Sequence, residues 1–340
     1  MIGIRTDANR KIATGHIMRC MNIADEIIKM EKEVIFFVAD EESASFVNER
    51  GFDCEILHSS WEHPIDEIDR LAGIIKEKAV DSMLFDSYSF DAKYFEALRA
   101  VSGIKIIYMD DLCRETMPVD TVINYNIYAG ELNYRDRYGE GVDLLLGPVY
   151  APLRHQFTEE FGKTCNIPPN VLISAGGGDV CDILVDILEE AENTPELKKV
   201  DLHVIIGSMS DDERDLMRLA WCCDNIFIHR NVSQMAKLMS ECDAAVSASG
   251  VILSELCCMK IPTIEFAIAD NQLLNARYYG DHGIMIAAGD IRENRETVVK
   301  RIVRELSELM SDKKRLADMR AGMEGICDGH GAKRIAEALC

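Results

Sequence analysis

The sequence is short of positive charge and of long apolar runs. It carries 37 Lys and Arg residues against 59 Asp and Glu residues, a formal net charge of −22 over 340 residues. Because an acidic surface repels polyanions, we expect no nucleic-acid partner. No apolar run approaches the roughly 18 residues that a membrane-spanning helix needs, so we expect no membrane partner.

Metal-binding and redox motifs are also missing. The twelve cysteines include two adjacent pairs but no C-x-x-C spacing, so zinc ribbons and thioredoxin-type sites lack support. The histidines show no H-x-H or H-x-x-x-H spacing, and we expect neither a metal ion nor another cofactor. The chain opens with Met-Ile-Gly-Ile-Arg-Thr-Asp and has no signal-peptide pattern, which predicts a cytoplasmic protein with free thiols.

Short runs rich in β-branched residues alternate with helical periodicity along the whole chain, which is typical of βα units around parallel sheets. The length exceeds the usual span of one hydrophobic core, so we predict two doubly wound, Rossmann-like α/β domains. The predicted strands are 2–5, 34–38, 53–57, 82–85, 105–108, 122–124 and 144–146 in the first half, and 171–174, 202–206, 225–228, 244–247, 263–266 and 284–286 in the second.

The segment "FGKTCNIPPNVLISAGGGD" holds the only Pro-Pro pair and reads as an interdomain linker. We therefore predict an N-terminal domain over residues 1–162 and a C-terminal domain over 163–340 that includes the terminal helices. Two doubly wound domains facing each other create a cleft at the carboxyl ends of their strands, where small ligands bind in such sheets.

The stretch "IGIRTDANRKIATGHIMRCMNIADEI" places a histidine at the start of a helix. Backbone N–H groups at a helix start favour the neutral form of an imidazole. A neutral imidazole accepts a proton, so His16 is a candidate general base. The alternative is that His16 only caps the helix.

The pattern R-x-D followed by G-H-x-x-R resembles the UDP-2,4-diacetamido-2,4,6-trideoxy-β-L-altropyranose hydrolase family of pseudaminic acid biosynthesis. That family is in turn similar to MurG-type glycosyltransferases of the GT-B fold. The positions that match this pattern are Arg5, Asp7, Gly15, His16 and Arg19. The resemblance implies that His16 and Asp7 act in catalysis and that Arg5, Gly15 and Arg19 contact the substrate.

Three later motifs extend the resemblance. "FDSYSF" offers Tyr88 as a third catalytic residue, and "GPVYAPLRHQF" offers Tyr150 and Arg154 to the substrate. "MDDL" supplies Asp110 and Asp111, for which a loop cap or a solvated turn is the alternative interpretation. Two adjacent carboxylates point to opposite sides of an extended chain, so we predict no magnesium site there.

The second half holds the motifs of the predicted UDP site, which are "VLISAGGGD" and "AAVSASGVILSELCCMKIPTIEFAIADNQ". Glycines after a strand let the backbone approach a phosphate. The resemblance implies that the helix start at Ser249 and Gly250 holds the diphosphate, that Glu255 holds ribose hydroxyls, and that the Asn271-Gln272 pair reaches the phosphate or the sugar. The base is then expected to be read by backbone near Ile228 and His229. The predicted UDP-binding residues are Gly176, Gly177, Asp179, Ile228, Ser249, Gly250, Val251, Glu255, Asn271 and Gln272.

Together these motifs predict a hydrolase that releases UDP from a UDP-sugar, with water held by His16 attacking the anomeric carbon and inverting it. The expected partner is the UDP-sugar substrate, and the sequence carries no pattern that indicates an oligomeric state. Two alternatives stay open: a GT-B glycosyltransferase that uses a UDP-sugar donor, and a non-catalytic nucleotide-sugar binding protein. The acidity of the first half argues against a lipid-linked acceptor.

Overall fold

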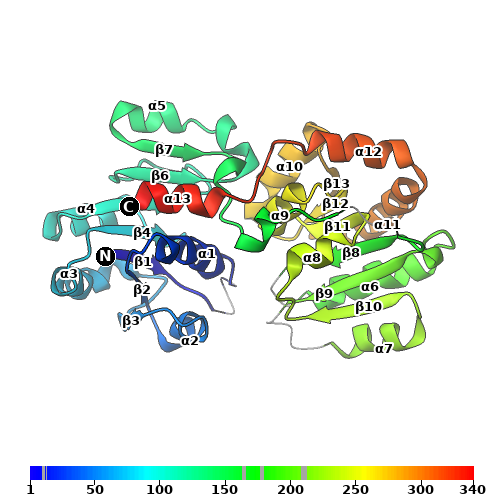
Figure 1. Ribbon diagram of the computed structural model, residues 1–340, viewed down its shortest axis with the longest axis horizontal. Coiled ribbons are helices and arrows are strands. Elements are labelled where there is room, and N and C mark those ends of the chain that lie inside the picture. The colour runs from blue at the N-terminus through cyan, green and yellow to red at the C-terminus, as the bar shows by residue number, and fades with distance from the viewer. Residues whose placement is uncertain (10–11, 13, 163–165, 177–179, 208–212) are drawn as a thin grey trace. The chain divides into compact units, whose positions relative to one another are not determined.

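The computed structural model describes residues 1–9, 12, 14–162, 166–176, 180–207 and 213–340. The chain forms two compact units, which Figure 1 colours along the sequence. The first unit comprises Met1–Arg154 together with His330–Cys340, and the second comprises His155–Gly329.

The first unit is built on a seven-stranded parallel sheet with the strand order β3-β2-β1-β4-β5-β6-β7. Its strands are β1 (Ile2–Thr6), β2 (Val34–Val38), β3 (Cys54–Ile56), β4 (Ser82–Asp86), β5 (Lys105–Met109), β6 (Thr121–Asn124) and β7 (Asp143–Leu146). Its helices are α1 (Gly15–Lys29), α2 (Glu41–Glu49), α3 (Ile68–Glu77), α4 (Ala92–Val101), α5 (Tyr134–Tyr138) and α13 (Gly331–Leu339).

Helices cover both faces of this sheet, as a parallel sheet requires. Every residue of β1, β2 and β4 is buried. Apolar side chains of α3 and α4 pack on one face of the sheet. Two helices begin at aspartate caps, because the Asp40 carboxylate accepts from Ser43 N and the Asp91 carboxylate accepts from Tyr94 N.

The second unit repeats the same winding with six parallel strands in the order β10-β9-β8-β11-β12-β13. Its strands are β8 (Asn170–Ser174), β9 (Asp201–Ile206), β10 (Ile226–Arg230), β11 (Ala244–Ala248), β12 (Thr263–Ala267) and β13 (Ile286–Asp290). Its helices are α6 (Cys181–Glu192), α7 (Arg214–Cys222), α8 (Met235–Ser240), α9 (Ile252–Cys258), α10 (Leu273–Asp281), α11 (Arg295–Ser311) and α12 (Lys313–Gly322).

The predicted strands all form within the described residues, twelve of them within two residues of their predicted bounds. The prediction for the last strand was wrong, because β13 occupies Ile286–Asp290 and not 284–286. The amides of Ile284 and Met285 both donate to Tyr279 O and so complete the end of α10, where Gly283 adopts a φ of 64°. Pairing with β12 therefore begins at Ile286.

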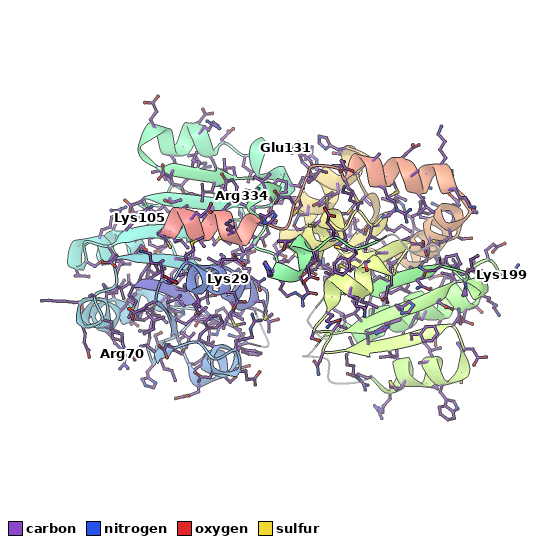
Figure 2. The ribbon with its side chains drawn as sticks, in the orientation of Figure 1. Lys29, Arg70, Lys105, Glu131, Lys199 and Arg334 are labelled. Carbon is purple, nitrogen blue, oxygen red and sulfur yellow. The ribbon has the colours of Figure 1, made fainter. Side chains whose placement is uncertain are left out.

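The division of the chain differs from the predicted domains 1–162 and 163–340. The first unit ends at Arg154, and the last eleven residues return to it. Figure 1 shows α13, in red, beside α1 and β4. Three side-chain hydrogen bonds join the last eleven residues to the rest of the first unit. Ser82 Oγ donates to Leu339 O, Lys105 Nζ donates to Ala338 O, and the Arg334 guanidinium donates to Val149 O (Lys105 and Arg334 are labelled in Figure 2).

The close approach of α13 to the chain at Ala151 predicts that Gly331 tolerates no side chain. A Cβ at Gly331 would lie 2.2 Å from Ala151 O and 2.4 Å from Tyr150 C, and both are backbone atoms that cannot rotate away. We expect Gly331→Ala to lower the free energy of unfolding by about 1 to 3 kcal/mol in chemical denaturation. Gly73→Ala is the control, since a Cβ there meets nothing within 4 Å inside α3 and should stabilise by up to about 1 kcal/mol. Equal effects of the two variants would contradict the packing of α13.

Candidate functional site

Some of the predicted site residues lie where the strand order of each sheet reverses. In the first sheet this switch point lies between β1 and β4, and in the second between β8 and β11. His16 stands in the first turn of α1, which follows β1, and Asp86 is the last residue of β4. Gly176 follows β8, and Ser249 follows β11. The carboxyl ends of strands at such a point form the usual ligand site of a doubly wound sheet.

His16 contacts a carboxylate that holds its ring. The Nδ1 atom lies 2.7 Å from Asp86 Oδ1, and the His16 side chain is 11% exposed. Burial acts to raise the pKa of Asp86, but the charges of Arg19 and His16 outweigh it and hold that pKa well below its usual range. Nδ1 also lies 3.1 Å from Arg19 NH2, which can only donate and would need a bare nitrogen. An ionised carboxylate only accepts, and the contact with Asp86 is the shorter one, so it favours a proton on Nδ1. In the neutral ring, Nε2 then carries the lone pair that a general base needs.

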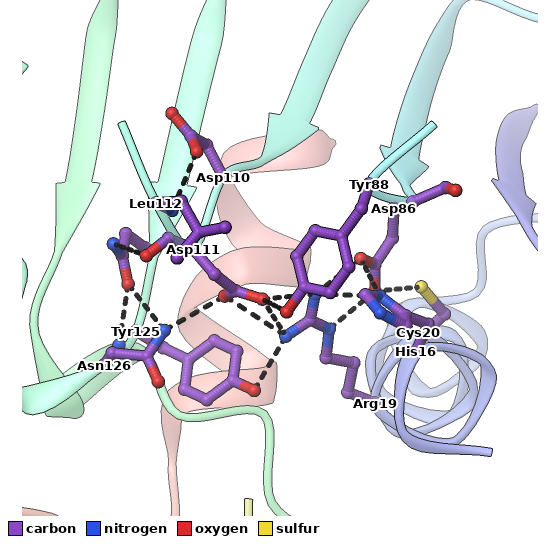
Figure 3. A network of polar contacts seen from close by, with 12 residues as sticks. His16, Arg19, Cys20, Asp86, Tyr88, Asp110, Asp111, Leu112, Tyr125 and Asn126 are labelled. Carbon is purple, nitrogen blue, oxygen red and sulfur yellow. Dashed lines mark hydrogen bonds and ion pairs between the residues drawn. The ribbon is translucent and has the colours of Figure 1, made fainter. Parts of the chain in front are cut away.

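Arg19 joins two buried carboxylates into one network (Figure 3). Its Nε and NH2 groups donate to the two oxygens of Asp86 at 2.6 and 2.5 Å, and its NH1 group donates to Asp111 Oδ2 at 3.1 Å. The Arg19 NH1 group also donates to Tyr125 OH at 2.8 Å. Burial acts to lower the pKa of Arg19, but Asp111 and Asp86 outweigh it and raise that pKa well above its usual value. Arg19 is 4% exposed and is a structural centre of the site.

Tyr88 links the second carboxylate to the imidazole. Its hydroxyl donates to Asp111 Oδ2 at 2.8 Å, and its ring meets His16 edge-on with centroids 4.7 Å apart. Asn126 Nδ2 donates to the other oxygen of Asp111 at 3.0 Å. Tyr88 is 43% exposed, so it is the site residue of this network most open to solvent.

The adjacent residue Asp110 has a different task. Its Oδ1 accepts from the amides of Leu112 and Cys113, and Figure 3 shows its side chain turned away from Arg19. Burial raises the pKa of Asp110. The loop-cap interpretation therefore holds for Asp110, whereas Asp111 belongs to the network around His16.

Arg5, which was predicted to contact the substrate, and Asp7, which was predicted to act in catalysis, both lie in the interior of the first unit. Arg5 is 0% exposed and donates to both oxygens of Glu67 and to Asp7 Oδ2. Asp7 is 1% exposed, and its Oδ1 accepts from Ala39 N at 2.7 Å. This buried group ties the end of β1 to β2 and α3. Both side chains are enclosed by the interior of the first unit.

The other predicted residues of the first unit lie closer to solvent. Gly15 is exposed, and a Cβ there would meet nothing within 4 Å. Tyr150 ends a short 3-10 turn, Pro148–Tyr150, and is half-buried. Arg154 is half-buried and is the last residue of the first unit before the chain passes to the second.

Some of the predicted UDP residues follow the ends of strands in the second unit, namely Gly176 after β8, Gly250 after β11 and Gln272 after β12. Gly176 adopts a φ of 98°, a conformation that favours glycine. A Cβ at Gly250 would lie 3.7 Å from Gln272 Nε2, and Gln272 Oε1 accepts from Ile268 N. The residues Gly177 and Asp179 lie outside the described residues.

The remaining predicted UDP residues differ in exposure. Asn271 is exposed, Glu255 is half-buried in α9, and Val251 is 38% exposed. The Ile228 side chain is half-buried and packs against the apolar core of the second unit. On the same strand, His229 Nε2 lies 2.9 Å from His203 Nδ1 of β9.

Ser249, which was predicted to contact the diphosphate, has a buried side chain in this structure. It is 0% exposed, and its hydroxyl contacts Glu265 Oε2. Glu265 is also 0% exposed, and burial raises its pKa to about 7. Sequence analysis missed Glu265, Asp86 and the role of Asp111. The signal for Asp86 and Asp111 was their place directly at or after a central strand, and a lone Glu in the apolar run "IPTIEFAIA" marked Glu265.

The described residues hold neither a metal-binding cluster nor a membrane-spanning helix. Within them, no three His, Cys, Asp or Glu side chains come together in a way that would hold a metal ion. Among the helices of that same part of the chain, none combines the length and the apolar character that crossing a membrane requires.

The chain is similar to proteins of polysaccharide and nucleotide-sugar metabolism. A family model described as "Protein of unknown function (DUF354)" matches residues 163–327. The spore coat polysaccharide biosynthesis protein SpsG of Bacillus subtilis is 23% identical over 345 residues, which cover 99% of this chain and 97% of that protein. The UDP-2,4-diacetamido-2,4,6-trideoxy-β-L-altropyranose hydrolase of Campylobacter jejuni is 22% identical over 281 residues, 82% of this chain and 96% of that protein. The resemblance predicted from the motifs is confirmed.

The solved structure of MurG from Acinetobacter baumannii superimposes with a TM-score of 0.68 at 13% identity, covering 99% of this chain and 98% of that one. This likeness concerns the fold. Together with the two parallel sheets it confirms the predicted class, which is two Rossmann-like domains as in GT-B glycosyltransferases.

The buried network predicts a large stability effect at Arg19. Arg19→Met removes the guanidinium and leaves Asp86 and Asp111 buried without their shared counter-charge. We expect a loss of about 3 to 5 kcal/mol in the free energy of unfolding. Arg50→Met is the control, because the Arg50–Asp25 ion pair is 36% and 43% exposed and should contribute less than about 1 kcal/mol. A loss at Arg19 no larger than that at Arg50 would contradict the network.

Proposed function

We propose that this protein is a nucleotide-sugar hydrolase that releases UDP from a UDP-linked 2,4-diacetamido-2,4,6-trideoxyhexose of the pseudaminic acid pathway. The observation that carries the proposal is the pair formed by His16 Nδ1 and Asp86 Oδ1 at the switch point of the first sheet. The similarity to the Campylobacter jejuni hydrolase over 82% of the chain supports the reaction and the substrate class.

The first unit supplies the base in this proposal. His16 Nε2 takes a proton from a water molecule, the water oxygen attacks the anomeric carbon, and the bond from that carbon to the β-phosphate oxygen breaks. The electron pair leaves with UDP, and the anomeric configuration inverts. UDP is a good leaving group, so a positioned base contributes about 10² to 10⁴ in rate.

The carboxylates of the network stabilise the charge that forms on His16. Asp86 and Asp111 together carry two negative charges and Arg19 carries one positive charge, so the group has a net charge of one negative. Asp86 accepts from Nδ1–H and thereby orients the ring and stabilises the imidazolium. Tyr88 holds the ring from its edge, and Asp7 positions the strand end that leads to α1. Both act through other residues.

The second unit supplies the nucleotide site in this proposal. The backbone at Gly176, Gly250 and Val251 faces the diphosphate, and Glu255 accepts from the ribose hydroxyls. Asn271 and Gln272 contact the phosphate or the sugar, while the backbone of β10 at Ile228 reads the base. Support comes from the places of Gly176 after β8, of Gly250 and Val251 after β11, and of Asn271 and Gln272 after β12, all beyond the carboxyl ends of strands.

A panel of UDP-sugars followed by proton NMR tests the reaction. We expect UDP and free sugar to appear without any acceptor, with the inverted anomer formed first. Product only in the presence of an acceptor would instead identify a glycosyltransferase. Binding without turnover across the panel would identify a nucleotide-sugar binding protein.

His16→Asn should abolish turnover and spare nucleotide binding. Removal of the base should lower kcat by about 10² to 10⁴, while the UDP dissociation constant changes less than about threefold. His58→Asn is the control, because His58 is exposed in the same unit and its φ of 51° suits asparagine. Loss of UDP binding in His16→Asn would show that His16 is a ligand-positioning residue.

Glu255→Gln should show the opposite pattern. The loss of a charged acceptor for ribose hydroxyls should weaken UDP binding about 10- to 100-fold in calorimetry. Glu293→Gln, at an exposed carboxylate of the same unit, should leave the dissociation constant unchanged. Wild-type UDP affinity in Glu255→Gln would remove Glu255 from the proposed site.

A further inference from the structure

Glu265 and Ser249 form a buried pair directly behind the proposed diphosphate site. Glu265 lies in the middle of β12, and Ser249 follows the neighbouring strand β11. Both residues are 0% exposed, and Glu265 Oε2 contacts the Ser249 hydroxyl. Ser249 is one residue before Gly250, where the proposed site begins. A change in the charge of this pair therefore acts at short range on a bound anion.

The second oxygen of Glu265 has no hydrogen-bond partner among the described residues. A buried carboxylate with one unpaired oxygen is costly when ionised and much less so when neutral. In the neutral acid, the proton on Oε2 donates to Ser249 Oγ and the bare Oε1 is only a carbonyl oxygen. The geometry of the pair thus favours the neutral acid over the ion.

The hydroxyl of Ser249 has one hydrogen to give. When Glu265 is ionised, that hydrogen goes to the carboxylate, and a negative charge lies behind Gly250. When Glu265 is neutral, its own hydrogen goes to Ser249 Oγ, and the Ser249 hydrogen is released to point elsewhere. Only the second arrangement leaves no negative charge behind Gly250.

The groups around Glu265 hold the pKa of its carboxyl close to neutral pH. Strand alternation places Glu265 on the face opposite the core residues Ile264 and Phe266, toward α9 and α10. Burial raises its pKa to about 7, while the Ser249 hydrogen bond and the charge of Arg301 in α11 lower it. From α10, burial raises the pKa of Tyr279 well above its usual value, so that phenol stays neutral, and Cys257 of α9 is a buried thiol.

We propose that Glu265 is a proton-linked positioning residue of the diphosphate site, so that binding of a nucleotide sugar to the second unit takes up one proton at the Glu265 carboxylate. The inference rests on the proposed function, because it needs the anion to bind at Gly250. It predicts that affinity for the anion falls as the pH rises above neutrality.

Calorimetry in buffers of different ionisation enthalpy counts the protons taken up. The His16→Asn background prevents turnover, and UDP-N-acetylglucosamine is the probe because its diphosphate has no ionisation near neutral pH. At pH 8 we expect an uptake approaching one proton for each probe bound, and less at pH 6. The dissociation constant should rise up to tenfold for each pH unit above 7.

Glu265→Gln in the same background mimics the neutral acid. We expect no proton uptake from this position, a flat dissociation constant from pH 6.5 to 8.5, and tighter binding than the parent at pH 8.5. Ser249→Ala is a second variant, and it removes a hydrogen bond that lowers the Glu265 pKa. Its proton uptake should move to higher pH. Glu293→Gln, at an exposed carboxylate, should keep the parent's uptake.

The outcomes separate the two proposals. Absence of binding by both UDP and UDP-N-acetylglucosamine, at concentrations up to the millimolar range, would overturn the nucleotide site itself. Binding with no proton uptake at pH 8, or with the same uptake in Glu265→Gln, would overturn the role of Glu265 and leave the nucleotide site standing. If Glu265→Gln fails to fold, the Ser249→Ala shift and the parent's uptake still decide the question.

Discussion

One guanidinium shared between two buried carboxylates organises the candidate site. Arg19 donates to both oxygens of Asp86 through Nε and NH2, and it donates to Asp111 through NH1. The three side chains come from α1, β4 and the loop after β5, so the ion group fixes these elements relative to one another. The His16 ring rests on this group, because Asp86 accepts from its Nδ1 atom. A buried charge cluster of this kind is stable only while every member keeps its partner.

The two units differ in the polar side chains that lie at the switch point of each sheet. Both sheets reverse their strand order at the fourth strand, and both bring polar side chains to that point. In the first unit the polar side chains are ions, which a fixed arginine compensates. In the second unit the polar pair is Ser249 and Glu265, and burial raises the pKa of the Glu265 carboxyl to about 7. Under the proposal made above, the first group keeps its charges near neutral pH, whereas the second takes up a proton when an anion binds.

Much of the fold follows from local pattern. A run such as "VIFFV" is buried on both faces and forms a strand in any parallel sheet, so strand positions were predictable. The start of α1 at Gly15 was also predictable, because the helical period of apolar residues begins there. The register of β13 was not, because the last turn of α10 takes the amides of Ile284 and Met285. The return of α13 to the first unit was not either, because only distant backbone at Ala151 shapes its start.

By itself, the sequence determined the order of strands and helices, the histidine at the start of α1 and the polar residues at strand ends, since these depend on neighbours within a few positions. Only the tertiary structure decided which of two adjacent aspartates joins the site. Asp110 and Asp111 are chemically identical, and the distinction comes from Arg19, 92 residues away from Asp111 along the chain. Tertiary packing also moved Arg5, Asp7 and Ser249 into the interior, because a carboxylate or hydroxyl is placed by the partners that surround it and not by its own sequence motif.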